Sequence, residues 1–143
     1  MITVFQYFAK PHTEAQKDSA VDLLSRVEAL RQEFYKDTER GPEIDPDTRN
    51  EISGTRGGDG DGGFRTPRST TGAPNSSHRQ AAGVDCYDPE DHFDSWLDRF
   101  ERDDGANTML EKHGLYREAP NATPTWVHLT TRAPGSGRRT FSP

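Results

Sequence analysis

Two histidines and one aspartate in this sequence are of the residue types that bind zinc. His78 lies in S-S-H-R-Q-A-A-G-V-D, in which Asp85 follows seven residues later, and His128 lies in W-V-H-L. Two imidazoles and one carboxylate can hold zinc and leave its fourth position open for water, as catalytic zinc requires. Bound zinc lowers the pKa of such a water toward about 7. Because lone histidines are usually structural or solvated, this spacing does not by itself identify a metal site.

Two short strands would position these side chains. The sequences G-V-D-C-Y at 83–87 and W-V-H-L-T at 126–130 are typical of strands. Alternation along the second strand points Trp126 and His128 to one face. In the first strand it points Cys86 away from Asp85, so we interpret Cys86 as a small core residue rather than a thiolate.

These segments resemble a known family of zinc enzymes. Residues 62–85 and 126–128 are similar to zinc D-alanyl-D-alanine carboxypeptidases and L-alanyl-D-glutamate endopeptidases. The family pattern is S-x-H-x-x-G-x-A-x-D and later W-x-H, and Ser76, His78 and Asp85 match it directly. The resemblance implies that the zinc ligands are His78, Asp85 and His128.

The resemblance extends to positions around the ligands. Ala81 stands where the family has glycine and Gly83 where it has alanine, an exchange of small residues that keeps tight packing feasible. The sequence G-G-F-R, which ends at Arg65, resembles the family's G-Y/F-R motif. The resemblance implies that Arg65 orients a substrate carboxylate or stabilises the developing oxyanion. It also implies that Ser76 contributes to substrate binding.

The chain differs from the family at the acidic residue that would act as the general base. The family has an acidic residue a few positions before the last histidine, whereas N-A-T-P-T-W-V before His128 contains none. Glu118, ten positions before His128, is the nearest carboxylate, and the stretch around it resembles small phage-encoded members with a glutamate at this place. A base must reach the zinc water directly or through one other water. We therefore expect Glu118 to be the base, with Asp88, Glu90 and Asp91 as alternatives.

Composition favours a thin-cored domain that needs additional stabilisation. Only 29% of the 143 residues are hydrophobic, and the mean hydropathy is -1.01. This length suits one domain, so we expect a single zinc metallopeptidase domain over residues 1–143. The lone cysteine, Cys86, cannot form an internal disulfide, which leaves a metal as the candidate stabiliser.

Charge and hydropathy restrict the partners. A net charge of -6 and a pI near 5.3 argue against nucleic acid, because phosphate binding needs a basic surface. We recognise neither a secretory signal nor a membrane-spanning stretch. The resulting expectation is a monomer made in the cytoplasm, without membrane insertion, that acts on the stem peptides of peptidoglycan after release.

The predicted fold is α+β, with a small, mainly antiparallel sheet that carries the zinc site. An N-terminal helix over 13–36 would begin at a T-x-x-Q capping box and pack against the sheet. A second helix would run from an N-cap at Asp88 to about Arg102, and a third from Thr108 to His113. Residues 115–117 read as a further strand, and the Gly- and Pro-containing tail closes the chain.

The polar segment 37–76 has the composition of a linker. A structureless stretch of this length inside a domain is usually functional, and Ile52 and Phe64 would anchor short strands at its two ends. Its run G-G-D-G-D-G-G hints at calcium, although the spacing differs from that of an EF-hand.

Three functional hypotheses follow. The first is a peptidoglycan peptidase, for which an endopeptidase of the endolysin type fits a minimal chain better than a D-alanyl-D-alanine carboxypeptidase. The second is a non-catalytic zinc-stabilised binding domain, because the same fold family includes hedgehog signalling domains. The third is a mostly disordered accessory protein, which the composition favours and the metal-binding residues oppose.

Overall fold

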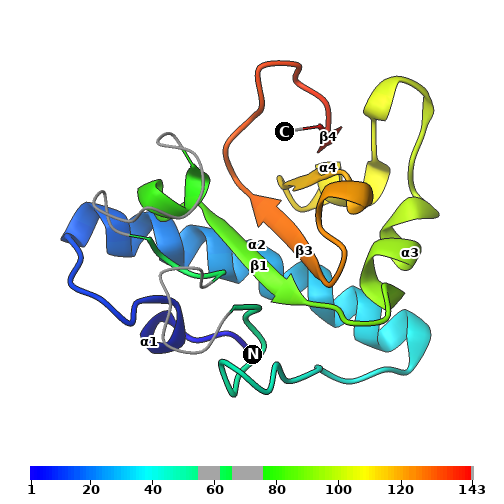
Figure 1. Ribbon diagram of the computed structural model, residues 1–143. Helices are drawn as coiled ribbons and strands as arrows, with labels where there is room; N and C mark the ends of the chain where they lie inside the picture. The colour runs from blue at the N-terminus through cyan, green and yellow to red at the C-terminus, as the bar shows by residue number, and fades with distance from the viewer. Residues whose placement is uncertain (55–61, 66–75, 143) are drawn as a thin grey trace.

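The computed structural model describes residues 1–54, 62–65 and 76–142 of the chain (Figure 1). Its helices and its mixed sheet of order β1-β3-β2-β4 confirm the expected α+β fold. The elements are α1 (Val4–Tyr7), α2 (Glu14–Thr38), 3-10 helix η1 (Ser77–Gln80), β1 (Gly83–Tyr87), α3 (His92–Asp98), η2 (Asp103–Gly105), α4 (Thr108–Lys112), β2 (Tyr116–Glu118), η3 (Pro120–Ala122), β3 (Trp126–Thr130) and β4 (Thr140–Phe141).

Helix α2 forms where the capping box predicts it. The Thr13 side chain accepts the backbone N–H of Gln16, whose own side chain accepts the N–H of Thr13. The helix ends at Glu39, which adopts the left-handed conformation. Within the described residues, no helix is both long and apolar enough to cross a bilayer. The stripe of α2 that faces the core contains Ala20, Leu23, Leu24, Val27, Leu30 and Phe34.

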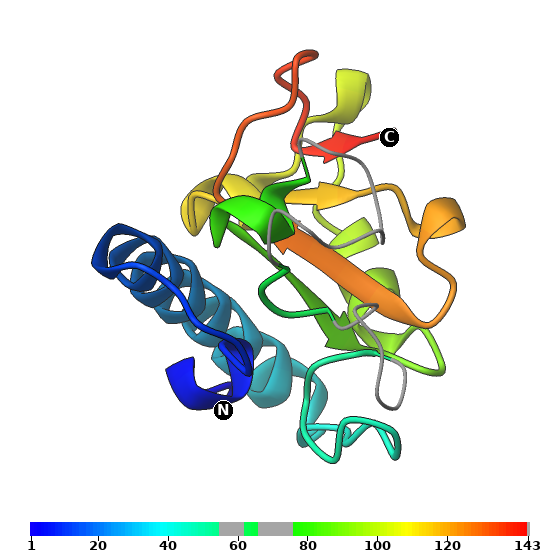
Figure 2. The same cartoon turned by 60° about the vertical axis from the view of Figure 1, so that its left-hand side comes forward.

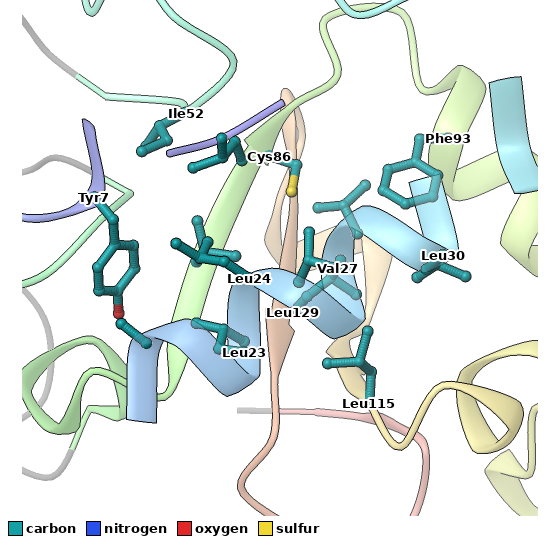
Figure 3. Packing of buried hydrophobic residues seen from close by; sticks show 14 of the residues in the cluster. Tyr7, Leu23, Leu24, Val27, Leu30, Ile52, Cys86, Phe93, Leu115 and Leu129 are labelled. Carbon is teal, nitrogen blue, oxygen red and sulfur yellow. The ribbon is translucent and has the colours of Figure 1, made fainter. Parts of the chain in front are cut away.

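The core lies between α2 and one face of the sheet. Figure 3 shows side chains of α2, among them Leu23 and Val27, lying against Cys86 of β1 and Leu129 of β3. In Figures 1 and 2, α2 runs along one side of these two strands. The burial of Cys86 confirms its interpretation as a core residue. Because side chains alternate along a strand, Asp85 and His128 lie on the opposite face.

Strand β4 was not anticipated from the tail. It pairs in parallel with β2, with Arg117 opposite Thr140 and Glu118 opposite Phe141. Arg117 points to the core side of the sheet, where its guanidinium contacts carboxylates that α3 and the following residues provide. Its Nε also donates to Thr140 Oγ1 at 3.0 Å, which ties the tail to the body of the domain.

The prediction of a helix from Asp88 to Arg102 was wrong at both ends. Helix α3 begins at His92, because Asp91 is left-handed and interrupts the helical path. The Asp88 carboxylate nevertheless caps this helix by accepting the N–H groups of Phe93 and Asp94. Asp88, Asp91 and Asp94 lie close enough to share a cation, and we attribute their proximity to this capping turn.

Ile52 and Phe64 anchor the polar segment 37–76, but they do not lie in the two predicted strands. Ile52 forms a single antiparallel bridge with Cys86, and Phe64 is buried without belonging to a strand. The Gly- and Asp-rich run lies largely outside the described residues, which resume at Gly62. Helix α1 was not predicted, and the third expected helix ends at Lys112.

Candidate metal centre

The three predicted ligands come together from three elements. His78 lies on η1, Asp85 on β1 and His128 on β3. The antiparallel register of β1 and β3 places Asp85 opposite His128. Asp85 Oδ1 lies 3.3 Å from His78 Nε2 and 2.8 Å from His128 Nδ1. The ligand atoms of all three residues lie within 4.8 Å of one another, so the residues can share one metal ion.

The backbone of the glycine pair before Phe64 orients His78. His78 Nδ1 lies 2.9 Å from the Gly63 carbonyl, so this nitrogen carries the proton and Nε2 presents its lone pair to the site. The Gly62 carbonyl accepts the Asp85 N–H at 2.7 Å, and a Cβ at Gly62 would lie 2.5 Å from Asp85 Cβ. Gly62 therefore lets this segment approach β1, and Gly63, whose Cβ would lie 2.8 Å from the Tyr7 carbonyl oxygen, lets it approach α1.

The donor set fits zinc. Bonds of about 2.0–2.1 Å in a tetrahedron place ligand atoms roughly 3.3 Å apart. The His78 to Asp85 contact matches this edge at 3.3 Å, and the His128 to Asp85 contact is a hydrogen bond of 2.8 Å. All three side chains are buried. Nitrogen and oxygen ligands in this number are those of catalytic zinc sites with an open fourth position.

The electrostatics of the site favour an ionised Asp85. Burial opposes ionisation of this carboxylate, but the charges and hydrogen bonds of His78 and His128 outweigh it and hold the pKa of Asp85 well below its usual range. Arg65 Nη2 lies 3.8 Å from Asp85 Oδ2. The Arg65 backbone N–H donates to the His78 carbonyl, which attaches this arginine to η1. Arg65 thus lies beside the predicted metal ligands.

An open cavity of about 570 Å³ lies over the three residues. Its volume is that of a small-ligand site. Glu118 and Arg65 line it together with the ligands, so the structure brings every predicted site residue to one place. Ser76 also lines it, and its hydroxyl accepts the His78 N–H at 3.3 Å, which gives Ser76 a capping role on η1.

Glu118 lines the same cavity as the three predicted ligands. The β2–β3 register, with Tyr116 opposite Thr130, runs toward Glu118 and His128. Burial raises the pKa of Glu118 above its ordinary value, and the charge of His128 opposes this shift. A carboxylate with a raised pKa is suited to accept a proton near neutral pH.

The alternative bases and the histidines His92 and His113 lie outside the cavity. Asp88 caps α3, and Glu90 pairs with His92 at 3.0 Å. His113 at the end of α4 contacts Glu33 of α2. Asp88, Glu90, Asp91, His92 and His113 are all missing from the lining of the cavity over the predicted ligands.

Sequence reasoning missed several residues of the cavity wall. Thr130 follows His128 by two residues, so strand alternation alone would have placed it on the same face. Arg132 and Phe141 line the cavity because the chain after β3 bends around it and β4 joins β2. Phe141 lies edge-on to the His128 ring, with the ring centres 6.4 Å apart. No local pattern in the tail predicts these contacts.

Comparison with known proteins identified no matching family model, no significantly similar curated protein and no significantly similar solved structure. The family resemblance of the motifs therefore stays a prediction. The functional argument depends on the geometry of the cavity and its residues.

Proposed function

We propose that this protein is a zinc-dependent peptidase that cleaves peptide bonds in bacterial peptidoglycan as an endopeptidase of the endolysin type. The observation that carries this proposal is the convergence of His78, Asp85 and His128 on one cavity that Glu118 and Arg65 also line. When bound by the three residues, zinc would supply a Lewis acid that activates water and polarises a carbonyl.

Glu118 and Arg65 have complementary roles in this proposal. The Glu118 carboxylate takes a proton from the attacking water and returns it to the leaving amine, as a general base and then a general acid. The Arg65 guanidinium offsets the negative charge that develops on the carbonyl oxygen or orients a substrate carboxylate. The burial of Arg65 supports either role, because a desolvated guanidinium acts more strongly than an exposed one.

The choice of substrate rests on the motif resemblance, and the cavity is compatible with it. An opening of about 570 Å³ suits a short peptide segment rather than a folded protein. The cavity wall is both apolar and charged, because Trp126, Phe141 and Arg132 all line it. Such a lining suits a peptide that carries small side chains and carboxylates, as a stem peptide does. The proposed site of action is the cell wall.

The test is digestion of purified peptidoglycan by the zinc-loaded protein, with the products identified by mass spectrometry. Cleavage inside the stem peptide is the expected result. Loss of a terminal D-alanine alone would instead identify a carboxypeptidase. The His128→Ala protein should be inactive and free of stoichiometric zinc, whereas His92→Ala, a histidine outside the cavity, should retain both properties. A wild-type protein that binds zinc and leaves peptidoglycan intact would contradict the peptidase and favour the non-catalytic binding domain.

A further inference from the structure

We propose that Ser77 is a positioning residue that sets which ring nitrogen of His128 faces the metal. This inference rests on the metal site of the proposed function, and it assigns a role to a residue at a variable position of the S-x-H pattern. Ser77 Oγ lies 3.2 Å from His128 Nε2, while His128 Nδ1 lies 2.8 Å from Asp85 Oδ1. The two nitrogens of the His128 ring therefore each have a side-chain partner.

Ser77 is held in place by backbone contacts of its own segment. The Ala82 N–H donates to the Ser77 carbonyl at 2.9 Å, and the Ala82 carbonyl accepts the Thr131 N–H at 3.1 Å. These bonds connect η1 to the chain that follows β3. Since β3 carries His128, the hydroxyl and the imidazole belong to one connected framework.

Gly83 provides independent support for this contact. A Cβ at Gly83 would lie 2.2 Å from Ser77 Oγ and 3.0 Å from His128 Cε1. Any side chain at this position would therefore enter the space in which the hydroxyl meets the ring. Glycine is required here by the close approach of two side chains, because a Cβ would displace one of them. This explains why position 83 of this chain is a glycine.

The two tautomers of histidine explain how the contact between Ser77 and His128 affects metal binding. A metal ligand must present a lone pair, so Nδ1 of His128 can bind a metal only in the tautomer that carries the proton on Nε2. The Ser77 hydroxyl accepts a hydrogen bond from that Nε2–H. A hydroxyl can also donate, so it can serve the opposite tautomer in which Nδ1–H donates to Asp85. In either state the Ser77 hydroxyl occupies Nε2, which leaves Nδ1 as the ring nitrogen that faces the metal.

The first test is the zinc affinity of Ser77→Ala, measured by competition with a chelator of known affinity. We expect the affinity to fall by about 10- to 100-fold, the usual effect of removing the partner of a metal-binding histidine. Ser19→Ala is the matched control, because Ser19 Oγ donates to the Ala81 carbonyl at 3.0 Å and so tethers the same segment without contacting His128. Equal losses in the two variants, or none in Ser77→Ala, would overturn the inference.

A spectroscopic measurement separates positioning from a general loss of structure. In the zinc-loaded wild type, nitrogen-15 NMR of His128 should show the proton on Nε2 with slow solvent exchange. In Ser77→Ala this proton should exchange faster, while the melting temperature of the metal-free protein stays near that of the wild type. A loaded wild type with its proton on Nδ1 would overturn the inference.

The outcomes for this inference and for the proposed function are distinguishable. A protein that needs Ser77 for tight zinc binding but does not cleave peptidoglycan would retain the positioning role and lose the peptidase proposal. A wild type that binds no zinc would overturn the metal site and the role of Ser77 together.

Discussion

Glu118 and the three predicted metal ligands share one cavity but differ in their surroundings. His78, Asp85 and His128 are buried and contact one another, whereas the Glu118 carboxylate is half-buried on the neighbouring strand. Burial raises its pKa, with an opposing effect from His128. These surroundings support the proposed role of Glu118 as a proton acceptor rather than a ligand.

Glu118→Gln should keep the metal and the fold but reduce peptidoglycan hydrolysis by about 100-fold or more, the usual contribution of a positioned acid or base. The substitution is nearly isosteric, so zinc content and melting temperature should stay near the wild-type values. Glu111→Gln, an exposed glutamate on α4, is the control and should retain full activity. Near-normal hydrolysis by zinc-loaded Glu118→Gln would exclude the base role.

At the scale of elements, a buried arginine joins the sheet to α3. Arg117 is 1% exposed, and its guanidinium contacts the carboxylates of Asp94, Asp98 and Glu101. One buried cation therefore faces three carboxylates, of which Asp94 is buried with it and Asp98 is exposed. Burial raises the pKa of Asp94 to about 7, although Arg117 opposes this shift. The folded state consequently binds a proton that an unfolded aspartate would release.

The stability of the wild type relative to Asp94→Asn should therefore depend on pH. The pKa of Asp94 rises from 3.8 to about 7 on folding, so the stabilisation by the bound proton is complete below pH 3.8. It is lost as the pH rises through about 7, by roughly 1.4 kcal/mol per pH unit in between. Denaturant unfolding at several pH values measures this difference. A difference that does not change with pH, as expected for the exposed Asp103→Asn, would contradict the raised pKa.

Helix α2 supplies the apolar surface on which the sheet rests. Leu30 is fully buried, so Leu30→Ala should lower the free energy of unfolding by about 2–5 kcal/mol through lost burial and the cavity that it leaves. Val21 lies on the same helix and is 47% exposed. Val21→Ala should cost well under 1 kcal/mol, because alanine has the higher helix propensity. Similar losses in the two variants would show that α2 does not pack through its predicted stripe.

At the scale of the whole molecule, the described residues fold around a core despite the low mean hydropathy of the chain. The low hydropathy is compatible with disorder, yet the described residues contain a contiguous buried cluster that spans α2, β1, β3 and α3. This core is thin, and the proposed zinc ion would join η1, β1 and β3 at the face of the sheet away from α2. We therefore expect metal binding to contribute to the stability of the fold.

Removal of zinc should lower the melting temperature of the wild type. At a free zinc concentration 100 times the dissociation constant, binding contributes about 2.7 kcal/mol, which corresponds to roughly 5–10 °C for a domain of this size. Differential scanning calorimetry with and without a chelator measures the shift. His128→Ala should melt at the same temperature in both conditions. An unchanged wild-type melting curve after demonstrated removal of the metal would exclude a stabilising role.

The sequence by itself determined the features that depend on neighbouring residues. Capping at Thr13 and the apolar stripe predict α2, and alternation predicts the strands that carry Asp85 and His128. The three residues that can share a metal were also identifiable from their motifs. These signals are local, because capping and alternation act over a few positions along the chain.

The tertiary structure alone decided how distant segments meet. The Gly63 carbonyl that orients His78, the Ser77 hydroxyl beside His128 and the position of Glu118 in the cavity all depend on the path of the chain between elements. The parallel pairing of β4, which brings Phe141 to the cavity, also depends on contacts far apart in sequence. Such contacts arise from close packing and strand register, and neither leaves a periodic pattern in the sequence.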